Sequence, residues 1–472
     1  MTKILTLVAG LVLAFPCIRG FARWERQGKA LRAVVLLLAL ELFEAAIYGN
    51  ENLVPRGLFH PGSGSTQLRL PEIFITFALL GRLVAKKLPQ RIGFPTMLWA
   101  AFGAWLAVEV VEGYIRGNSH AIALFQAKAI IYVVGGIALA GAVPVREYLD
   151  AEVFERLTRW FAPLLVVLDV MTAGHQAYTV SLPLLPLPSF GVIGSNAGTM
   201  FGALGLVTLI LELGKKRRNL WTITCTIPLF LCTVLSGQRA ALLGLGASVA
   251  FLLLATVASI SRRRLRVRPA ELVLGMAAVV ALVLGIVFVP AAIGDRAPQV
   301  PFSSTVNSSF HSTGKAESAQ ARLNEFSLAR QMIPHHLIIG TGLGFQYSYY
   351  NPGSYMEMMS DLTEDIYTDL WLRTGIIGLG LFVVAVLVSL GDGWRVWRRH
   401  EDRMVAVFAV ALMAVVLGLL VKGGFESDFE NYGLATILGL FFGMLRSAVT
   451  SAGTTLPVAQ LLLDGRDVDE RV

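Results

Sequence analysis

The residues best suited to chemistry lie in one polar stretch between two apolar segments, from Gly294 to Asp365. The stretch contains Arg322, a pair of adjacent histidines that ends at His336, and the acid Glu364 directly before Asp365. Guanidinium groups bind phosphate oxygens, and a carboxylate or an imidazole can remove a proton from a hydroxyl. The stretch therefore predicts a site that combines anion binding with general-base catalysis.

A second arginine, Arg239, follows Ser236-Gly237-Gln238 and directly precedes an apolar helix. Its charge adds to the positive N-terminal end of that helix, and the two together suit a phosphate. The alternative is an arginine that snorkels to the membrane surface. For Arg322 the alternative is a solvated charge on an amphipathic helix, with Phe326 on its apolar side and Glu325 on its polar side.

Several ionisable residues lie inside apolar runs. Lys128 falls within one predicted span, and Glu41 and Glu44 fall within another. Such groups face a cavity or a partner, so Lys128 either belongs to the site or forms a structural Lys–Glu pair. Glu364 and Asp365 also have a structural explanation, because acids are favoured at the start of a helix.

The sequence offers no ligand set for a metal ion. The two histidines lack a third ligand at a suitable spacing, and the three cysteines form no CxxC motif. Gly340-Thr341-Gly342-Leu343-Gly344 lacks the Lys-Ser/Thr that follows a phosphate-binding P-loop. We interpret it as a tight turn that permits close approach of the backbone.

The elements that must position these residues are membrane helices. Of the 472 residues, 55% are hydrophobic and 15% are charged, whereas a soluble domain has about 25% charged residues. Apolar runs of about 20 residues recur, and each is long enough to cross a bilayer. We predict an all-α, polytopic helical bundle of twelve or thirteen spans with a large outer loop that carries amphipathic helices.

The net charge of +8 does not indicate nucleic-acid binding. Lys and Arg gather in short loops between apolar runs, as the positive-inside rule requires of cytoplasmic loops. This rule places the large loop and Arg239 on the same, non-cytoplasmic face. Among the predicted helices are Phe94–Ile115 and His120–Ala142, and we expect Val145–Trp160 to lie along the cytoplasmic interface.

The chain then divides into four parts. Residues 1–293 form transmembrane helices, 294–365 the outer catalytic loop, 366–449 further transmembrane helices, and 450–472 a polar cytoplasmic tail.

The order of the short motifs resembles the O-antigen ligase and polymerase superfamily of bacterial envelopes. The motifs are Arg239 in Ser-Gly-Gln-Arg-Ala, then Arg322, the segment His336–Gly342, the acidic pair Glu364-Asp365, and Gly375-Ile376-Ile377-Gly378. The resemblance covers roughly residues 195–445. It implies a GT-C-like helical fold in the inner membrane with the active site facing the periplasm.

The resemblance also implies the reaction. Members of the superfamily transfer a glycan from undecaprenyl pyrophosphate to an acceptor hydroxyl, with inversion and without a metal or other cofactor. Their two arginines, which match Arg239 and Arg322, hold the pyrophosphate, whose charge grows as the sugar bond breaks. Lys128 is a further candidate for this role. Glu364 is the candidate base, with His336 and Asp365 as alternatives.

One departure concerns the acceptor. In the ligases a histidine followed by Asn, Ser or Gln stands eleven residues before the Gly-x-x-Gly pair, where this chain has Glu364 and Asp365. The difference favours a polymerase over a ligase that acts on lipid A-core. A lipid-linked glycan flippase or other transporter is an alternative of another class, and it would not need two arginines and an acid around one outer loop.

Overall fold

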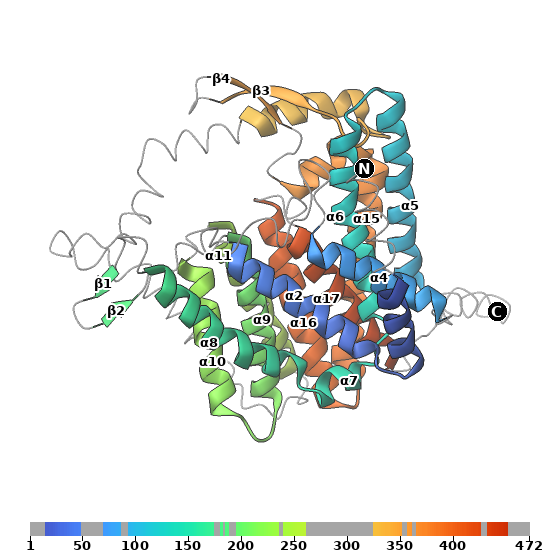
Figure 1. Ribbon diagram of the computed structural model, residues 1–472. Helices are drawn as coiled ribbons and strands as arrows, with labels where there is room; N and C mark the ends of the chain where they lie inside the picture. The colour runs from blue at the N-terminus through green and yellow to red at the C-terminus, as the bar shows by residue number, and fades with distance from the viewer. Residues whose placement is uncertain are drawn as a thin grey trace, which may run out of the picture.

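The structure, a computed structural model, describes residues 15–48, 69–85, 93–173, 180–182, 185–187, 195–235, 239–260, 324–351, 356–360, 365–425 and 432–451. Helices form most of this part (Figure 1). Their bounds in chain order are 15–26, α2 (Ala30–Tyr48), α4 (Leu70–Val84), α5 (Phe94–Ile115), α6 (His120–Ala140), α7 (Val145–Asp150), α8 (Val153–Ala173), α9 (Ser195–Gly214), α10 (Leu220–Leu235), α11 (Arg239–Ile260), 324–332, the short 3-10 helix η4 (Ile333–His336), α15 (Ile366–Arg399), α16 (Arg403–Gly423) and α17 (Tyr432–Ser451).

Strands occur in the described residues only as two small antiparallel hairpins. The first pairs β1 (Val180–Leu182) with β2 (Leu185–Leu187). The second pairs β3 (Tyr347–Asn351) with β4 (Met356–Ser360). Neither hairpin joins a larger sheet, so the predicted all-α class is confirmed.

Six helices in the described part are long and apolar enough to cross a membrane: α5, α6, α9, α15, α16 and α17. Shorter apolar helices within α10 and α11 lie beside them. The prediction of a polytopic membrane bundle is confirmed. The count of twelve or thirteen spans stays a prediction, because residues 1–14 and 261–323 lie outside the described part.

The centre of the bundle is α16, most of whose side chains are buried. It packs against α9, α11, α15 and α17, while α17 packs closely against α6. Glycines permit this last contact, because a Cβ atom at Gly136 of α6 would lie 2.8 Å from the backbone nitrogen of Leu440 on α17. Small residues at such crossings allow membrane helices to gain van der Waals contact, since lipid provides no hydrophobic driving force between them.

The predicted interfacial helix Val145–Trp160 is wrong in its bounds. The backbone turns at Glu152, which has a φ of 48°, and this turn separates α7 from α8. From Val153 the chain continues as one helix to Ala173, through Pro163. Residues expected to lie on an interface, such as Phe154, are therefore buried in the bundle.

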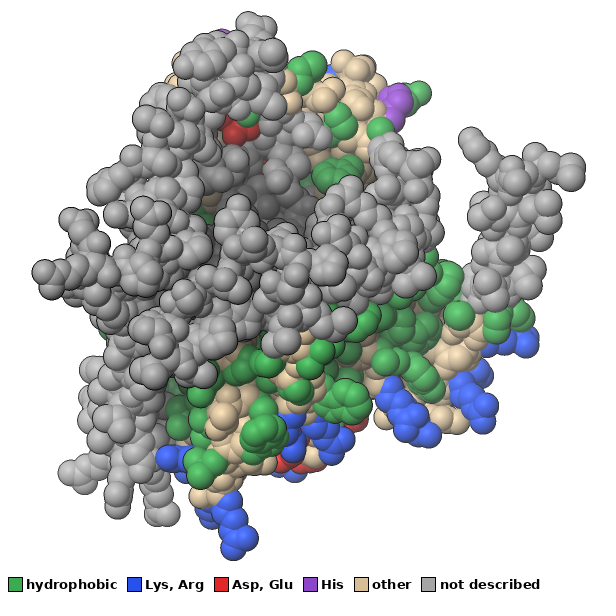
Figure 2. Space-filling model, turned by 60° about the vertical axis from the view of Figure 1, so that its left-hand side comes forward, with side chains coloured by type: hydrophobic (Ala, Val, Ile, Leu, Met, Phe, Trp, Pro, Cys, Tyr) green, Lys and Arg blue, Asp and Glu red, His purple; other side chains and the backbone are tan. Residues whose placement is uncertain are grey.

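The two ends of the bundle differ in character. The upper ends of α5, α6 and α15 and the β3–β4 hairpin lie at one end, and α7 lies at the other (Figure 1). Lys and Arg side chains gather along the lower edge of the molecule, away from the hairpin (Figure 2). This is the charge distribution that the positive-inside rule produces across a membrane.

Candidate functional site

The structure describes some of the predicted site residues and not others. His336, Asp365 and Lys128 are described with their side chains. Arg239 is described as the first residue of α11, and its side chain lies outside the described part. Arg322 and Glu364 also lie outside the described residues. The site is therefore built from the elements that flank these positions.

The element that organises this end of the molecule is a break in α15. Gly375 has φ 63° and ψ −172°, so the helix is interrupted there and the carbonyl groups just before it do not find regular helical partners. The glycine-rich turn supplies donors instead. The backbone nitrogen of Thr341 donates to Leu372 O at 2.8 Å, and that of Gly342 donates to Arg373 O at 3.1 Å.

Two further hydrogen bonds are made by the residues on either side of Gly375. Trp105 of α5 donates its indole nitrogen to Thr374 O at 3.0 Å. The backbone nitrogen of Ile376 donates to Leu337 O at 2.9 Å. A Cβ atom at Gly375 would collide with the carbonyl of Ile338, so the close approach requires glycine. The last residues of the outer segment of α15, residues 366–374, are thereby hydrogen-bonded to the loop and to α5.

The same glycine-rich turn is fixed to α5 and α6. The backbone nitrogen of Leu343 donates to Glu109 O at 3.1 Å, and that of Gly344 donates to the side chain of Gln126 at 2.8 Å. Asn118, between the two helices, donates to Leu343 O at 3.2 Å. The interpretation of this segment as a turn with close backbone approach agrees with these contacts.

His336 lies against the outer end of α5. Its Nδ1 atom is 3.3 Å from Nη1 of Arg116, which also donates to Gly340 O at 2.8 Å. Arginine can only donate, so the imidazole accepts through Nδ1 and carries its proton on Nε2. Burial, together with the positive charges of Arg116 and His335, lowers the pKa of His336 and favours this neutral form.

Asp365 is the N-cap of α15. Its carboxylate accepts hydrogen bonds from the backbone nitrogens of Tyr367 at 3.1 Å and Thr368 at 2.8 Å. These bonds satisfy amide groups that a helix start otherwise leaves unpaired. The structural explanation given above for an acid at this position accounts for Asp365.

The starts of α15 and α11 lie beside the same helix end. The hydroxyl of Tyr367 donates to Leu420 O of α16 at 2.8 Å. A Cβ atom at Gly244 of α11 would lie 2.6 Å from Gly418 O, which also belongs to α16. The last turns of α16 therefore contact both the helix that begins at Arg239 and the helix that follows Glu364.

Lys422 lies in that last turn of α16 and is completely buried. Its Cβ atom would lie 3.2 Å from a Cβ atom at Gly244. A lysine at membrane depth is costly unless it has a role or a partner. Sequence reasoning missed Lys422, although a lysine near the end of an apolar run was a signal.

Lys128 is part of a separate set of buried charges. Its ammonium lies 3.6 Å from the carboxylate of Glu72 on α4. Arg69, just before α4, bridges Glu44 at 2.5 Å and Glu41 at 3.2 Å. The alternative of a structural Lys–Glu pair therefore has a specific partner, Glu72, in place of the two glutamates of α2.

The prediction for the loop helix was wrong about the sides on which Glu325 and Phe326 lie. In helix 324–332 the carboxylate of Glu325 is buried, whereas Phe326 is 40% exposed. Glu325 accepts a hydrogen bond from the hydroxyl of Tyr347 at 3.1 Å, which explains why an acid faces inward. Phe326 instead lies under the guanidinium of Arg330, 5.7 Å from its ring centroid.

Two more charges that sequence reasoning missed lie in the outer segment of α15. Asp369 accepts from Nε of Arg373 at 2.7 Å, and both side chains are buried. Glu109 of α5 is also buried, beneath the glycine-rich turn. The signal for Asp369 and Arg373 was a pair of opposite charges four residues apart within an otherwise apolar run, since such residues meet on one helix face.

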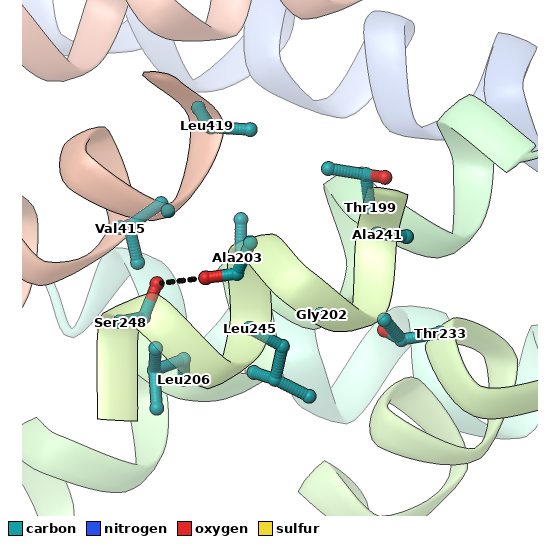
Figure 3. Close-up of a pocket in the computed structure, with 12 residues that line it drawn as sticks. Thr199, Gly202, Ala203, Leu206, Thr233, Ala241, Leu245, Ser248, Val415 and Leu419 are labelled. Carbon is teal, nitrogen blue, oxygen red and sulfur yellow. Dashed lines mark hydrogen bonds between the residues drawn. The ribbon is translucent and has the colours of Figure 1, made fainter. Parts of the chain in front are cut away.

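A cavity of about 30 Å³ lies between α9, α10, α11 and α16 (Figure 3). Two of its polar side chains donate to backbone carbonyls: Ser248 to Gly244 O at 3.0 Å and Thr233 to Gly198 O at 2.7 Å. The space is that of about one water molecule. It is a packing gap and does not include the charged residues discussed above.

The described residues contain no group of three or more His, Cys, Asp or Glu side chains placed to hold a metal ion.

Comparison with known proteins finds one similar family. The family model described as O-antigen ligase matches residues 224–383. No curated protein matches the chain. The matched region begins in α10 and ends in α15, so it includes Arg239, Arg322, His336, Glu364 and the break at Gly375. The resemblance found from the sequence is confirmed within this region: residues 224–383 are similar to the O-antigen ligase family.

Proposed function

We propose that the protein is a glycosyltransferase that polymerises a lipid-linked glycan at the periplasmic face of a bacterial inner membrane. The donor is an oligosaccharide on undecaprenyl pyrophosphate, and the acceptor is a hydroxyl group of a second glycan. The observation that supports this most is that α11 and α15, whose first residues lie inside the matched family region, both contact the last turns of α16 near their starts. α11 begins at Arg239, and α15 begins directly after Asp365.

Arg239 and Arg322 bind the pyrophosphate of the donor in this proposal. The leaving group gains negative charge as the bond between the sugar C1 and its oxygen breaks, and two guanidinium groups stabilise that charge. The N-terminus of α11 adds its partial positive charge beside Arg239. Lys422, which is buried beside α11, is a further candidate for supplying positive charge. Lys128 is a weaker candidate for this role, because it pairs with Glu72.

Glu364 is the proposed base. It precedes Asp365, whose carboxylate is occupied by two backbone nitrogens, and an ionised glutamate is available at neutral pH. His336 presents a protonated Nε2 and is a poor base in that form. The acceptor hydroxyl gives its proton to Glu364 and attacks C1 in line, so the configuration inverts and undecaprenyl pyrophosphate leaves.

The outer loop, residues 294–365, closes over both substrates in this proposal and excludes water. Hydrolysis of the donor is the competing reaction, so a closed site preserves the glycan for the acceptor. The flanking parts, residues 1–293 and 366–449, hold the loop at the bilayer, where the polyprenyl chain of the donor stays.

A ligase is the second candidate, because the matching family model is described as O-antigen ligase. It would use the same donor and transfer the finished glycan to lipid A-core or another acceptor. Glu364 and Asp365 occupy the positions of the ligase His and its amide or hydroxyl neighbour, and this difference favours the polymerase.

Substitution of the two arginines tests the proposed function. We expect Arg239→Ala and Arg322→Ala each to reduce glycan transfer by at least about a hundredfold, the loss typical when a charge-stabilising donor is removed. Membrane levels should stay normal. Arg330→Ala is the matched control, because Arg330 is an exposed arginine of the loop helix. Normal transfer by both arginine variants would reject the proposed binding of the pyrophosphate by Arg239 and Arg322.

A further inference from the structure

Four buried polar side chains meet where the loop joins α15. Glu325 comes from helix 324–332, Tyr347 begins β3, and Asp369 and Arg373 lie on the outer segment of α15. Each is no more than 5% exposed. We call these four residues the joint cluster. Two carboxylates, one guanidinium and one phenol are thus removed from water together.

The contacts within the joint cluster pair its members. Tyr347 donates to Glu325 at 3.1 Å, and Arg373 donates to Asp369 at 2.7 Å. Burial, with the negative charges of Glu325 and Asp369, raises the pKa of the Tyr347 hydroxyl, which keeps it protonated as a donor. Charges from both pairs act on the Tyr347 hydroxyl, so the two pairs are electrostatically coupled.

An apolar contact accompanies this unit. Ala329 and Ile333 of the loop pack with Tyr347 and with Leu372 of α15 in a small cluster separate from the main core of the bundle. The main chain of Arg373 also accepts from Gly342. The described loop residues and the outer segment of α15 therefore share a small core of their own.

Stability alone does not explain why this core carries charges. A buried ion pair is often no more stabilising than apolar side chains of the same volume, because the cost of removing both charges from water offsets their attraction. What a charged and hydrogen-bonded pair adds is a defined geometry, since each group must keep its partner.

The sequence shows what that geometry would control. Glu325 lies three residues after Arg322, and Asp369 lies five residues after Glu364. The joint cluster thus connects the segment that follows Arg322, the proposed pyrophosphate-binding residue, with the segment that follows Glu364, the proposed base.

We propose that the joint cluster is a set of positioning residues for glycan transfer, with the Asp369–Arg373 pair and the Tyr347–Glu325 bond setting the Arg322 segment against the Glu364 segment. This inference rests on the proposed function. A small error in the placement of a base or a charge-stabilising group reduces the rate much more than it reduces substrate binding.

The test replaces the Asp369–Arg373 pair with neutral side chains of similar size, in the double variant Asp369→Asn/Arg373→Met. Removing both charges avoids an unpaired buried charge, so the variant should fold. We expect kcat to fall at least tenfold while KM for the lipid-linked donor changes less than twofold. The single variant Arg373→Lys keeps the charge, and its kcat should lie between that of the double variant and that of the wild type.

The matched control is Asp392→Asn/Arg395→Met. Asp392 and Arg395 form a 2.6 Å ion pair near the other end of the same helix. This control should keep kcat and KM within twofold of the wild-type values. Tyr347→Phe, which removes only a hydroxyl, should reduce kcat between three- and tenfold. A wild-type kcat in the neutral double variant would overturn the proposal, as would a loss fully explained by a smaller folded fraction.

A distance measurement tests positioning without relying on glycan transfer. Spin labels are placed at Gln331→Cys in the loop and Leu387→Cys on α15, both exposed positions, after Cys17→Ser. We expect one narrow distance distribution in this background and a broader or shifted one when the neutral double variant is added. An unchanged distribution would overturn the positioning role, even if the protein transfers glycans. A protein with the expected distances but no transfer would reject only the proposed reaction.

Discussion

At the level of single residues, the direction of one hydrogen bond separates the candidates for the general base. Arg116 can only donate, so His336 accepts at Nδ1 and its other nitrogen carries a proton. Asp365 is bound to two backbone nitrogens at the start of α15. Glu364 is the remaining acid of the motif, and its assignment as the base stays a proposal.

The variant His336→Gln tests this argument, because a glutamine side chain can still accept from Arg116. We expect glycan transfer to stay within threefold of the wild-type rate, measured at neutral pH with purified protein. His336→Ala should be less active than His336→Gln, since it leaves Arg116 without that acceptor. Loss of more than a hundredfold in His336→Gln would instead identify His336 as the base.

The lowered pKa of His336 gives the same variant a second readout. The folded protein binds this proton less readily than the unfolded chain, whose histidine pKa is about 6.5. The contribution to stability is therefore present above about pH 6.5 and is lost as the pH falls towards the lower folded pKa. The melting temperature of wild-type protein should fall more than that of His336→Gln between pH 7.5 and pH 5.

At the level of elements, the break in α15 separates residues 366–374, which follow the N-cap Asp365, from the rest of the helix. Without it, the carbonyl groups of residues 372 and 373 would bond within the helix and could not accept from Thr341 and Gly342. The glycine-rich turn, the indole of Trp105 and the outer segment of α15 are thus mutually dependent.

Gly375→Ala should disrupt this arrangement. A side chain at this positive φ is strained, and its Cβ atom would collide with the Ile338 carbonyl. We expect a loss of stability of about 2 kcal/mol or more and at least a tenfold loss of transfer. Gly380→Ala is the control, because a Cβ atom there meets nothing within 4 Å. Melting temperature and transfer rate are measured on both, and equal behaviour of the two variants would refute the role of the break.

At the level of the whole molecule, hydrophobic patterning predicted much of the fold. The bounds of α5 agree with the expected helix Phe94–Ile115, and α6 differs from its expectation only at its last residues. These elements were predictable because apolar length and polar punctuation are local properties of the chain. The separation of α7 from α8 was missed because it depends on one backbone angle, at Glu152.

Only part of the candidate site was predictable from the sequence. The glycine-rich turn was identified as a close approach, but its partners on α5 and α15 are far away in sequence. The inward face of Glu325 could not be predicted, since it depends on Tyr347 and α15. Buried charges contradict hydrophobic periodicity, and only their three-dimensional partners explain them.

The most direct test of the proposed function uses purified protein in detergent with an undecaprenyl-pyrophosphate oligosaccharide and no lipid A-core. Wild type is compared with Glu364→Gln, and the products are separated by size. We expect a ladder of longer glycans from the wild type and none from the variant. Transfer only after lipid A-core is added would identify a ligase, and a ladder from Glu364→Gln would exclude Glu364 as the base. A wild-type protein that transfers no glycan to either acceptor would contradict the account.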